Sequence, residues 1–314
     1  MNLHINKKLF ADTIRATSQH LEIKEEFIEK DYWITLLLSR LAENKYAKET
    51  VFKGGTSLSK GFGLIDRFSE DVDLAVINTD NKSNNQIKTI IRTIEKEITG
   101  NLVEITLEGV TSKGSRFRKS IFEYESIDSK NKSNRLIVEI NSFANPFPYQ
   151  SMAIKSMINN FLVQTNNTKY VDQYNLQAFS INVLNKEQTM IEKLVSLIRF
   201  SYDENPNDSI SQKIRHFYDL YFLAKDMECA RFLKSATFKQ RFNEILDHDR
   251  DLFDEPQGWK YRTISESPLI NNFPAIWDKL KSTYKTELSA LAYTPIPDQQ
   301  LIFRSFTKIL EQLK

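Results

Sequence analysis

Two aspartates separated by one residue, Asp71 and Asp73, have the spacing of a metal-binding pair. They open the run Asp-Val-Asp-Leu-Ala-Val-Ile, whose alternating apolar residues predict a strand with one buried face. Side chains two residues apart on a strand share a face, so the carboxylates project together from Cα atoms about 6.6 Å apart. Such a pair can bind Mg²⁺, whereas without a cation the two like charges would destabilise the strand. An ordinary solvated strand face is the alternative interpretation.

A glycine-rich segment precedes the aspartates and predicts a short helix that starts after a strand. The segment consists of Gly54, Gly55, Thr56 and Ser57. Unpaired backbone N–H groups at a helix start can bind phosphate oxygens, and glycine lets a ligand approach the backbone closely. The segment matches neither a P-loop nor a dinucleotide-binding fingerprint. Its position sixteen residues (71 − 55) before the aspartates favours a nucleotide and metal site over a simple turn.

A third acid is expected on a neighbouring strand. In Leu-Ile-Val-Glu-Ile the alternation buries the aliphatic residues and turns Glu139 to the other face, where it is the candidate third metal ligand. Equally, Glu139 could be an exposed residue beside Arg135. Glu104 is the competing candidate for the third acid.

Two residues of later helices complete the chemistry. Lys193 lies at the edge of an apolar stripe, which predicts a partly buried lysine, or else one whose stem covers apolar surface while its ammonium stays in water. Asp219 lies among aromatic residues, which predicts a raised pKa and a carboxylate able to accept a proton. The alternative for Asp219 is a surface ion pair with Arg215, four residues earlier.

These motifs together resemble a known family. Gly-Gly-Thr-Ser-Leu and Arg-Phe-Ser-Glu-Asp-Val-Asp-Leu resemble the signature of the AbiEii/AbiGii-type toxin branch of the DNA polymerase β-like nucleotidyltransferases. Glu29-Lys30-Asp31-Tyr32-Trp33 is similar to the N-terminal helix of that branch. The segments LNKEQTMIEKLVSL and IRHFYDLYFL resemble its two downstream helical motifs. Many relatives carry an acid where this chain has His216, which is a departure from the pattern.

The resemblance implies a transfer of an NMP from an NTP to a hydroxyl group, with Mg²⁺ as cofactor. Asp71, Asp73 and Glu139 would be metal ligands, and Lys193 would contact the triphosphate. Asp219 would act as base or as organiser of Lys193. Arg67 is expected to hold the loop before the aspartates, with phosphate contact as the lesser alternative.

The resemblance also implies a biological role, namely the toxin of a toxin–antitoxin or phage abortive-infection pair. Its partners would be an NTP, a cognate antitoxin and an RNA acceptor such as tRNA. A basic segment with Arg116 and Arg118 on one predicted strand face, and Lys113 and Lys119 nearby, could bind an RNA backbone or protect an edge strand. The alternatives are a small-molecule or protein hydroxyl as acceptor, or a module that binds NTP without turnover.

The elements that position these residues indicate an α+β protein. Helices are predicted over 21–44 and 84–99, with strands at 50–52 and 72–77 and three antiparallel strands between 102 and 143. Beyond residue 183 the pattern is mostly helical. With two prolines at 146 and 148, residues 1–148 form the predicted mixed-sheet, polymerase β-like nucleotidyltransferase core with its N-terminal helices. Residues 149–314 form the helical domain that contributes Lys193 and Asp219 to the site.

The bulk composition narrows the class of protein. Lys and Arg number 43 and Asp and Glu number 41, so any nucleic-acid binding must depend on local patches rather than on overall charge. The single cysteine excludes an intrachain disulfide, and the four histidines lack zinc-site spacing. No apolar run approaches the length of a membrane span, and we expect a cytoplasmic protein with no membrane partner.

Overall fold

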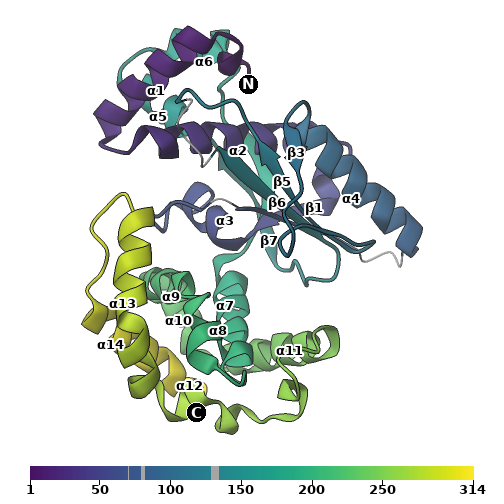
Figure 1. The fold of residues 1–314 in the computed structure, drawn as a ribbon, viewed down its shortest axis with the longest axis vertical. Coiled ribbons are helices and arrows are strands. Elements are labelled where there is room, and N and C mark those ends of the chain that lie inside the picture. The colour runs from purple at the N-terminus through teal and green to yellow at the C-terminus, as the bar shows by residue number, and fades with distance from the viewer. Residues whose placement is uncertain (70, 79–81, 129–133) are drawn as a thin grey trace. The chain divides into compact units, whose positions relative to one another are not determined.

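The computed structural model describes residues 1–69, 71–78, 82–128 and 134–314 (Figure 1). These residues form two compact units. Unit 1 comprises Met1–Phe62 and Phe68–Leu184, and unit 2 comprises Gly63–Arg67 and Asn185–Lys314. The chain therefore leaves unit 1 for a five-residue segment that belongs to unit 2, and then returns to unit 1.

Unit 1 is built on a mixed sheet of eight strands within the described residues. The strand order is β3-β5-β6-β2-β1-β8-β7, with β4 paired to β5. The pairs β2/β6 and β1/β8 are parallel and the others are antiparallel. The strands are β1 (Thr50–Lys53), β2 (Asp71–Val76), β3 (Val103–Ile105), β4 (Ser112–Lys113), β5 (Phe117–Glu123), β6 (Arg135–Asn141), β7 (Tyr149–Ile154) and β8 (Phe179–Leu184).

Helices α2 and α4 pack on one face of this sheet, α4 against β5 and β6 and α2 against β8 (Figure 1). α4 begins at a capping box of Ser83 and Gln86 and buries a stripe of isoleucines at helical spacing, as the 3.6-residue pattern predicts. The helices of unit 1 are α1 (Lys7–Leu21), α2 (Glu25–Glu43), α3 (Gly54–Lys60), α4 (Asn84–Thr99), α5 (Met157–Gln164) and α6 (Thr168–Gln173).

The block Glu29-Lys30-Asp31-Tyr32-Trp33 lies on the buried middle of α2 and holds neighbouring segments together. Asp31 forms an ion pair with Lys60 at the end of α3 and accepts a hydrogen bond from the N–H of Met157 (2.7 Å). Glu29 accepts a hydrogen bond from the N–H of Ile127 (2.8 Å). The ion pair of Asp31 with Lys60 holds the end of α3, the helix that starts at Gly54, against α2, and the two hydrogen bonds hold the start of α5 and the segment at Ile127 there as well.

Unit 2 is helical apart from the isolated bridge between Arg67 and Ala292. An aromatic cluster forms part of its core, with Phe217 of α9 4.7 Å from Phe306 of α14 and 5.3 Å from Trp277 of α13, measured between ring centroids. Its helices are α7 (Lys186–Phe200), α8 (Pro206–Ser211), α9 (Arg215–Lys225), α10 (Met227–Leu233), α11 (Ala236–Leu252), α12 (Pro268–Asn271), α13 (Phe273–Leu291) and α14 (Gln299–Glu311).

The α+β class and the mixed sheet followed by a mostly helical half are confirmed. The division between the units differs from the predicted boundary after residue 148 and lies after Leu184. The reason is strand pairing: β8 extends the sheet beside β1, and β7 pairs with β8 as the next strand. No helix in the described part of the chain is long and apolar enough to cross a membrane.

Candidate active site

The glycine-rich segment and the aspartate strand are joined in unit 1. Thr56 donates a hydrogen bond from its hydroxyl to the backbone carbonyl of Asp71 (2.6 Å), and Ser57 donates one to the carbonyl of Gly54 (2.8 Å). Both side chains are buried, and their hydroxyls stabilise the backbone of this segment rather than pointing to solvent. The N-cap residue Lys53 gives no side-chain hydrogen bond to the helix. The backbone N–H groups of the first turn, starting at Gly54 and Gly55, are therefore the groups with which this segment could bind a phosphate.

Gly54 is required by the closeness of Asp73. Its φ is +78°, and a Cβ placed on it would lie 2.1 Å from Oδ2 of Asp73. Any side chain at this position would collide with the carboxylate in a backbone conformation that already favours glycine. The start of α3 and the Asp73 carboxylate are thus in direct contact.

The two aspartates lie on one face of β2, as the alternation predicts. Asp71 and Asp73 are partly exposed, whereas Val72 and Leu74 are buried on the face packed by the helices. The parallel register with β6 sets Glu139 beside Asp73. Residues paired in register project to the same face, so Glu139 shares the face of the aspartates.

Glu139 and Glu104 are distinguished by this register. Glu104 of β3 pairs with Phe122 of β5, whereas Glu139 pairs with Lys119 of β5, an odd number of residues away. Odd spacing on a strand means opposite faces, so Glu104 lies on the face opposite Asp73. Of the two glutamates, Glu139 is therefore the one that shares the face of Asp73.

Glu139 does not pair with Arg135, which was the alternative interpretation from the sequence. Glu139 lies 3.6 Å from Nζ of Lys119, and Glu104 lies 2.8 Å from Nζ of Lys113. Arg135, the predicted neighbour of Glu139, instead pairs with Glu123 of β5 (3.1 Å). Sequence analysis missed Lys119 as the partner of Glu139, because only the register of β5 and β6 brings the two together.

Asp71 and Asp73 fit Mg²⁺ that is bound partly by the protein and partly by its substrate. No group of three His, Cys, Asp or Glu residues close enough to hold a metal occurs among residues 1–69, 71–78, 82–128 and 134–314. Mg²⁺ in nucleotide-using enzymes is usually bound by one or two carboxylates together with substrate phosphates, rather than by a closed protein cage. Asp71 and Asp73 lie next to a helix start that can bind phosphate, and so they fit binding by two carboxylates together with substrate phosphates.

A buried cluster of three charged residues lies in unit 2. Arg67 donates from Nε to Oδ1 of Asp219 and from Nη2 to Oδ2 of Asp219, both at 2.7 Å. Nζ of Lys193 lies 2.8 Å from the same Oδ2. The side chains of Arg67, Asp219 and Lys193 are 3%, 0% and 8% exposed, so this triad is shielded from solvent. The triad joins the Gly63–Arg67 segment, α7 and α9.

The electrostatics of the triad correct one prediction. Burial by itself would raise the pKa of Asp219, but the charges and hydrogen bonds of Arg67 and Lys193 outweigh burial and hold the pKa well below its usual range. The raised pKa predicted for Asp219 is wrong, because its cationic partners come from distant parts of the sequence. An ionised, doubly paired carboxylate is a poor proton acceptor, and its geometry is that of a group orienting Lys193.

Arg67 is the member of this triad that comes from the Gly63–Arg67 segment, and His216 lies close to the triad. Arg67 is 3% exposed and binds the Asp219 carboxylate through the edge of its guanidinium that carries Nε and Nη2, which anchors the Gly63–Arg67 segment to α9. His216 is buried enough that the pKa of its imidazole falls well below the usual range, with the charge of Lys193 lowering it further. Nδ1 of His216 has no hydrogen-bond partner in the described residues. The imidazole of His216 is therefore neutral at pH 7.

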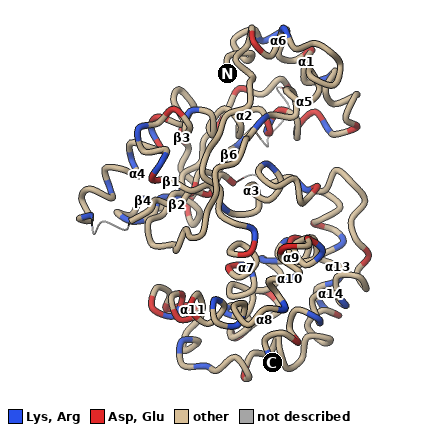
Figure 2. The backbone as a smooth tube through the Cα atoms, turned by 180° about the vertical axis from the view of Figure 1, so that it is seen from behind, with Lys and Arg blue, Asp and Glu red and all other residues tan. Residues whose placement is uncertain are grey.

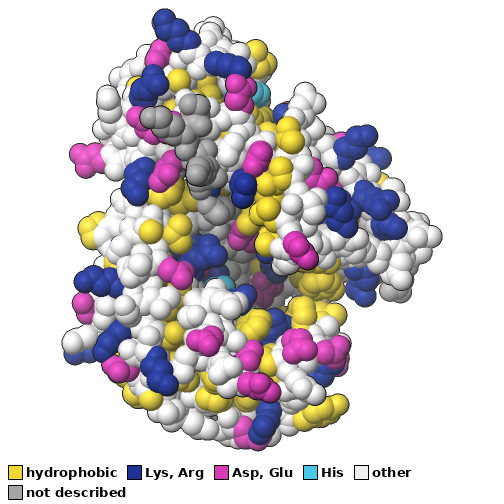
Figure 3. Space-filling model, viewed as in Figure 1, with side chains coloured by type: hydrophobic (Ala, Val, Ile, Leu, Met, Phe, Trp, Pro, Cys, Tyr) yellow, Lys and Arg dark blue, Asp and Glu magenta, His cyan; other side chains and the backbone are white. Residues whose placement is uncertain are grey.

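The predicted basic patch is not assembled. Arg118 is buried against α4 and pairs with Glu95 (2.6 Å), while Lys113 and Lys119 are engaged with glutamates on opposite faces. Arg116, just before β5, is exposed. On the surface seen in Figure 3, and along the backbone in Figure 2, charges of both signs are interspersed.

Arg199, one and a half turns after Lys193, has a structural role. Its guanidinium lies 4.1 Å from the ring centroid of Phe253 and 4.8 Å from that of Phe200. It also lies 3.5 Å from Asp249. These contacts hold the end of α11 against α7.

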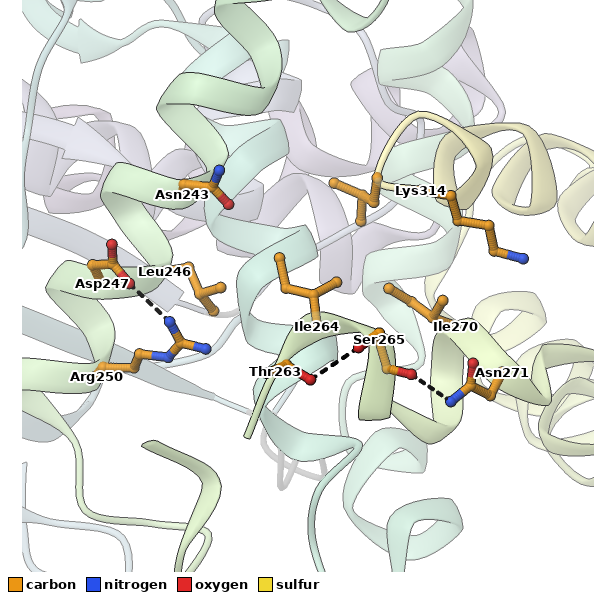
Figure 4. Close-up of a pocket in the computed structure, with 11 residues that line it drawn as sticks. Asn243, Leu246, Asp247, Arg250, Thr263, Ile264, Ser265, Ile270, Asn271 and Lys314 are labelled. Atoms are coloured by element: carbon orange, nitrogen blue, oxygen red, sulfur yellow. Dashed lines mark hydrogen bonds and ion pairs between the residues drawn. The ribbon is translucent and has the colours of Figure 1, made fainter. Parts of the chain in front are cut away.

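Unit 2 also contains a cavity of about 740 Å³ beside α11 (Figure 4). Its polar walls are tied to one another: Arg250 donates to Asp247 (2.8 Å), and Asn271 donates to the carbonyl of Ser265 (2.6 Å). None of the site residues predicted from the sequence lines this cavity. This cavity is therefore separate from the residues that the sequence singles out.

Comparison with known proteins identifies the family. Residues 36–311 match the model of the family described as nucleotidyl transferase AbiEii toxin, type IV TA system. The chain belongs to the AbiEii family of nucleotidyltransferase toxins. The resemblance inferred from Gly-Gly-Thr-Ser-Leu and Arg-Phe-Ser-Glu-Asp-Val-Asp-Leu is thus confirmed, as is the enzyme class.

The structural comparison of this nucleotidyltransferase toxin gave a match to MenT4, a nucleotidyltransferase toxin from Mycobacterium tuberculosis H37Rv. The two chains share 14% sequence identity with a TM-score of 0.46, over 96% of this chain and 99% of MenT4. A search among curated proteins found no match.

The variant Gly54→Ala tests the contact with Asp73. We expect nucleotidyl transfer to fall about 100-fold, the size of effect caused by misplacing a reacting group by about 1 Å, with an unchanged far-UV circular dichroism spectrum. Gly63→Ala is the matched control, because Gly63 also has positive φ (+60°) but nothing lies within 4 Å of an added Cβ. An equal loss in both variants would assign the effect to backbone strain and contradict the proposed contact.

The variant Asp219→Asn tests the charge balance of the triad. At pH 7 we expect the free energy of unfolding to fall by about 3–5 kcal/mol, because two buried cations lose their partner. The folded pKa of Asp219 lies below the ordinary value of 3.8, so the stabilisation by this carboxylate is present above that value and is lost as pH falls through the folded pKa. The difference between wild type and variant should therefore shrink below about pH 4.

Urea unfolding at pH 7, 4 and 3 measures this difference. Asp247→Asn is the control, since that side chain is 68% exposed and its loss should change stability by less than about 0.5 kcal/mol. A difference between wild type and Asp219→Asn that stays constant with pH would contradict the depressed pKa.

Proposed function

We propose that this nucleotidyltransferase toxin moves an NMP from an NTP to a hydroxyl group of an RNA acceptor, tRNA first among them, and releases pyrophosphate. Mg²⁺ is the proposed cofactor. The observation that carries the proposal is the contact between Gly54 and Asp73, because it joins a phosphate-binding helix start to a carboxylate pair in one turn. The family membership supports the same reaction class.

In this proposal Asp71 and Asp73 hold the Mg²⁺ ion, with Glu139 as the third acid on the same face of the sheet. When bound, Mg²⁺ supplies positive charge against the triphosphate. The first-turn N–H groups of α3 bind phosphate oxygens and orient the NTP. The bond between the α- and β-phosphates breaks, and a phosphodiester bond to the acceptor oxygen forms.

Lys193 is proposed to contact the triphosphate, as the family resemblance implies. Its ammonium is fixed by Asp219, which is itself fixed by two hydrogen bonds from Arg67. Asp219 and Arg67 are then positioning residues, and the proton of the acceptor hydroxyl is released to solvent water.

The acceptor is proposed from the family resemblance. The segment around Arg116 and Arg118 gives it little support, because Arg118 is buried and its lysine neighbours are paired. A small-molecule or protein hydroxyl is the alternative acceptor. We further propose a cognate antitoxin as the functional partner, a role in abortive infection by phage, and activity in the cytoplasm, where NTPs and RNA are present.

Incubation of the full chain with α-labelled NTPs, Mg²⁺ and total RNA tests the reaction. We expect label in the RNA fraction with wild type and only background with the double variant Asp71→Asn/Asp73→Asn, which cannot hold the cation. Glu139→Gln should also lower transfer. Glu104→Gln is the matched control, because Glu104 is a paired glutamate on the opposite face, and it should retain wild-type transfer.

The distribution of label identifies the acceptor. Label in protein or in a small molecule, with none in RNA, would replace RNA by the alternative acceptor. Equal transfer by wild type and by the double variant would contradict the assignment of the metal site.

The variant Lys193→Met tests the second group of residues. We expect transfer to fall by about 100-fold or more, the size of effect seen when one preorganised charge or donor is removed. Lys193→Arg should restore little, since a planar guanidinium does not replace a compact ammonium. Lys186→Met is the matched control: Lys186 is on the same helix, is 12% exposed and is also ion-paired, with Asp226 and Glu228. Comparable losses in the two methionine variants would show that transfer depends on the stability of α7 rather than on Lys193.

A further inference from the structure

A row of four charged residues crosses one face of the sheet in unit 1. Lys53 of β1 is in register with Asp73 of β2, Asp73 with Glu139 of β6, and Glu139 with Lys119 of β5. Residues in register on neighbouring strands project to the same face. The row therefore reads lysine, aspartate, glutamate, lysine across four adjacent strands.

The centre of this row brings like charges together. Neighbouring strands are about 4.8 Å apart, so the carboxylates of Asp73 and Glu139 start from adjacent positions and repel each other. Nζ of Lys119 lies 3.6 Å from Oε2 of Glu139, and the two side chains are 31% and 29% exposed. The ammonium compensates the glutamate from the side away from Asp73.

The ion pair with Lys119 involves Glu139, the proposed third metal ligand. Glu139 has the register of a ligand, yet within the part of the chain that the structure describes it does not form a three-acid group with Asp71 and Asp73. Its carboxylate instead contacts Lys119. The ammonium of Lys119 thus neutralises Glu139 in place of a metal ion.

We propose that Lys119 is the counter-ion of Glu139 and that a divalent cation must displace its ammonium in order to recruit this carboxylate. The inference rests on the proposed function, in which Asp71, Asp73 and Glu139 bind the cation. The exchange breaks the ion pair between Lys119 and Glu139 and releases the ammonium, a group suited to bind phosphate. Lys119 is therefore a positioning residue that weakens the binding of the bare cation.

Mn²⁺ binding to the full chain without nucleotide tests the inference, with free Mn²⁺ followed by its electron paramagnetic resonance signal. We expect Lys119→Met to lower the Kd for Mn²⁺ about two- to fivefold, which corresponds to the strength of a partly exposed ion pair. Lys113→Met is the matched control. Lys113 lies on the opposite face and also pairs with a glutamate, so its loss removes the same charge and should leave the Kd unchanged.

A double-mutant cycle separates the specific pair from a general charge effect. In the background of Glu139→Gln, adding Lys119→Met should give no further tightening, because the carboxylate that the ammonium holds is gone. An unchanged or higher Kd in Lys119→Met, or equal tightening in Lys113→Met, would overturn the inference. Tightening that persists in the Glu139→Gln background would also overturn it.

The same titration distinguishes this inference from the proposed function. Loss of Mn²⁺ binding in Asp71→Asn/Asp73→Asn supports the metal site whatever Lys119 does. If wild type binds no Mn²⁺ at millimolar concentration, or if the double aspartate variant binds it equally well, the metal site itself fails and the inference fails with it.

Discussion

The close contact between Gly54 and the carboxylate of Asp73 is the constraint on which the candidate site depends. The Asp73 carboxylate fills the position that a Cβ at residue 54 would need, so the chain can turn from β1 into α3 only with glycine there. The antiparallel register of Lys53 with Asp73 brings the two segments together, and the hydrogen bond from Thr56 to the Asp71 carbonyl holds them. A helix start that attracts phosphate and a strand that carries two carboxylates thereby become one structural feature.

A second constraint is the balance of charge in unit 2. Asp219 has no contact with solvent and stays ionised only because Arg67 and Lys193 surround it. Arg67 comes from the segment Gly63–Arg67, which in sequence lies between α3 and β2 yet belongs to unit 2. The chain between α3 and β2 is therefore held by a partner of Arg67 that lies 152 residues away in the sequence. Replacing Asp219 with a neutral residue leaves two buried cations without their anionic partner.

Local patterns in the sequence predicted much of the fold and part of the candidate site. The alternation around Asp71 and Asp73 predicted their shared face, and the isoleucine spacing predicted α4 as Asn84–Thr99. The partners of Asp219 were beyond reach of the sequence, because a raised or lowered pKa depends on which distant charges pack against the carboxylate. The choice of Glu139 over Glu104 likewise required strand register, since both glutamates alternate with apolar residues. The unit boundary differed because two prolines preceded an edge strand rather than a linker.

The central claim is that Asp71 and Asp73 hold a divalent cation together with the phosphates of an NTP bound at the start of α3. Anomalous diffraction from crystals grown with Mn²⁺ and a non-hydrolysable NTP measures this directly. The account predicts a manganese peak in contact with both carboxylates, with phosphate oxygens hydrogen-bonded to first-turn N–H groups of α3. A manganese peak elsewhere, or a triphosphate bound away from Gly54, would contradict it.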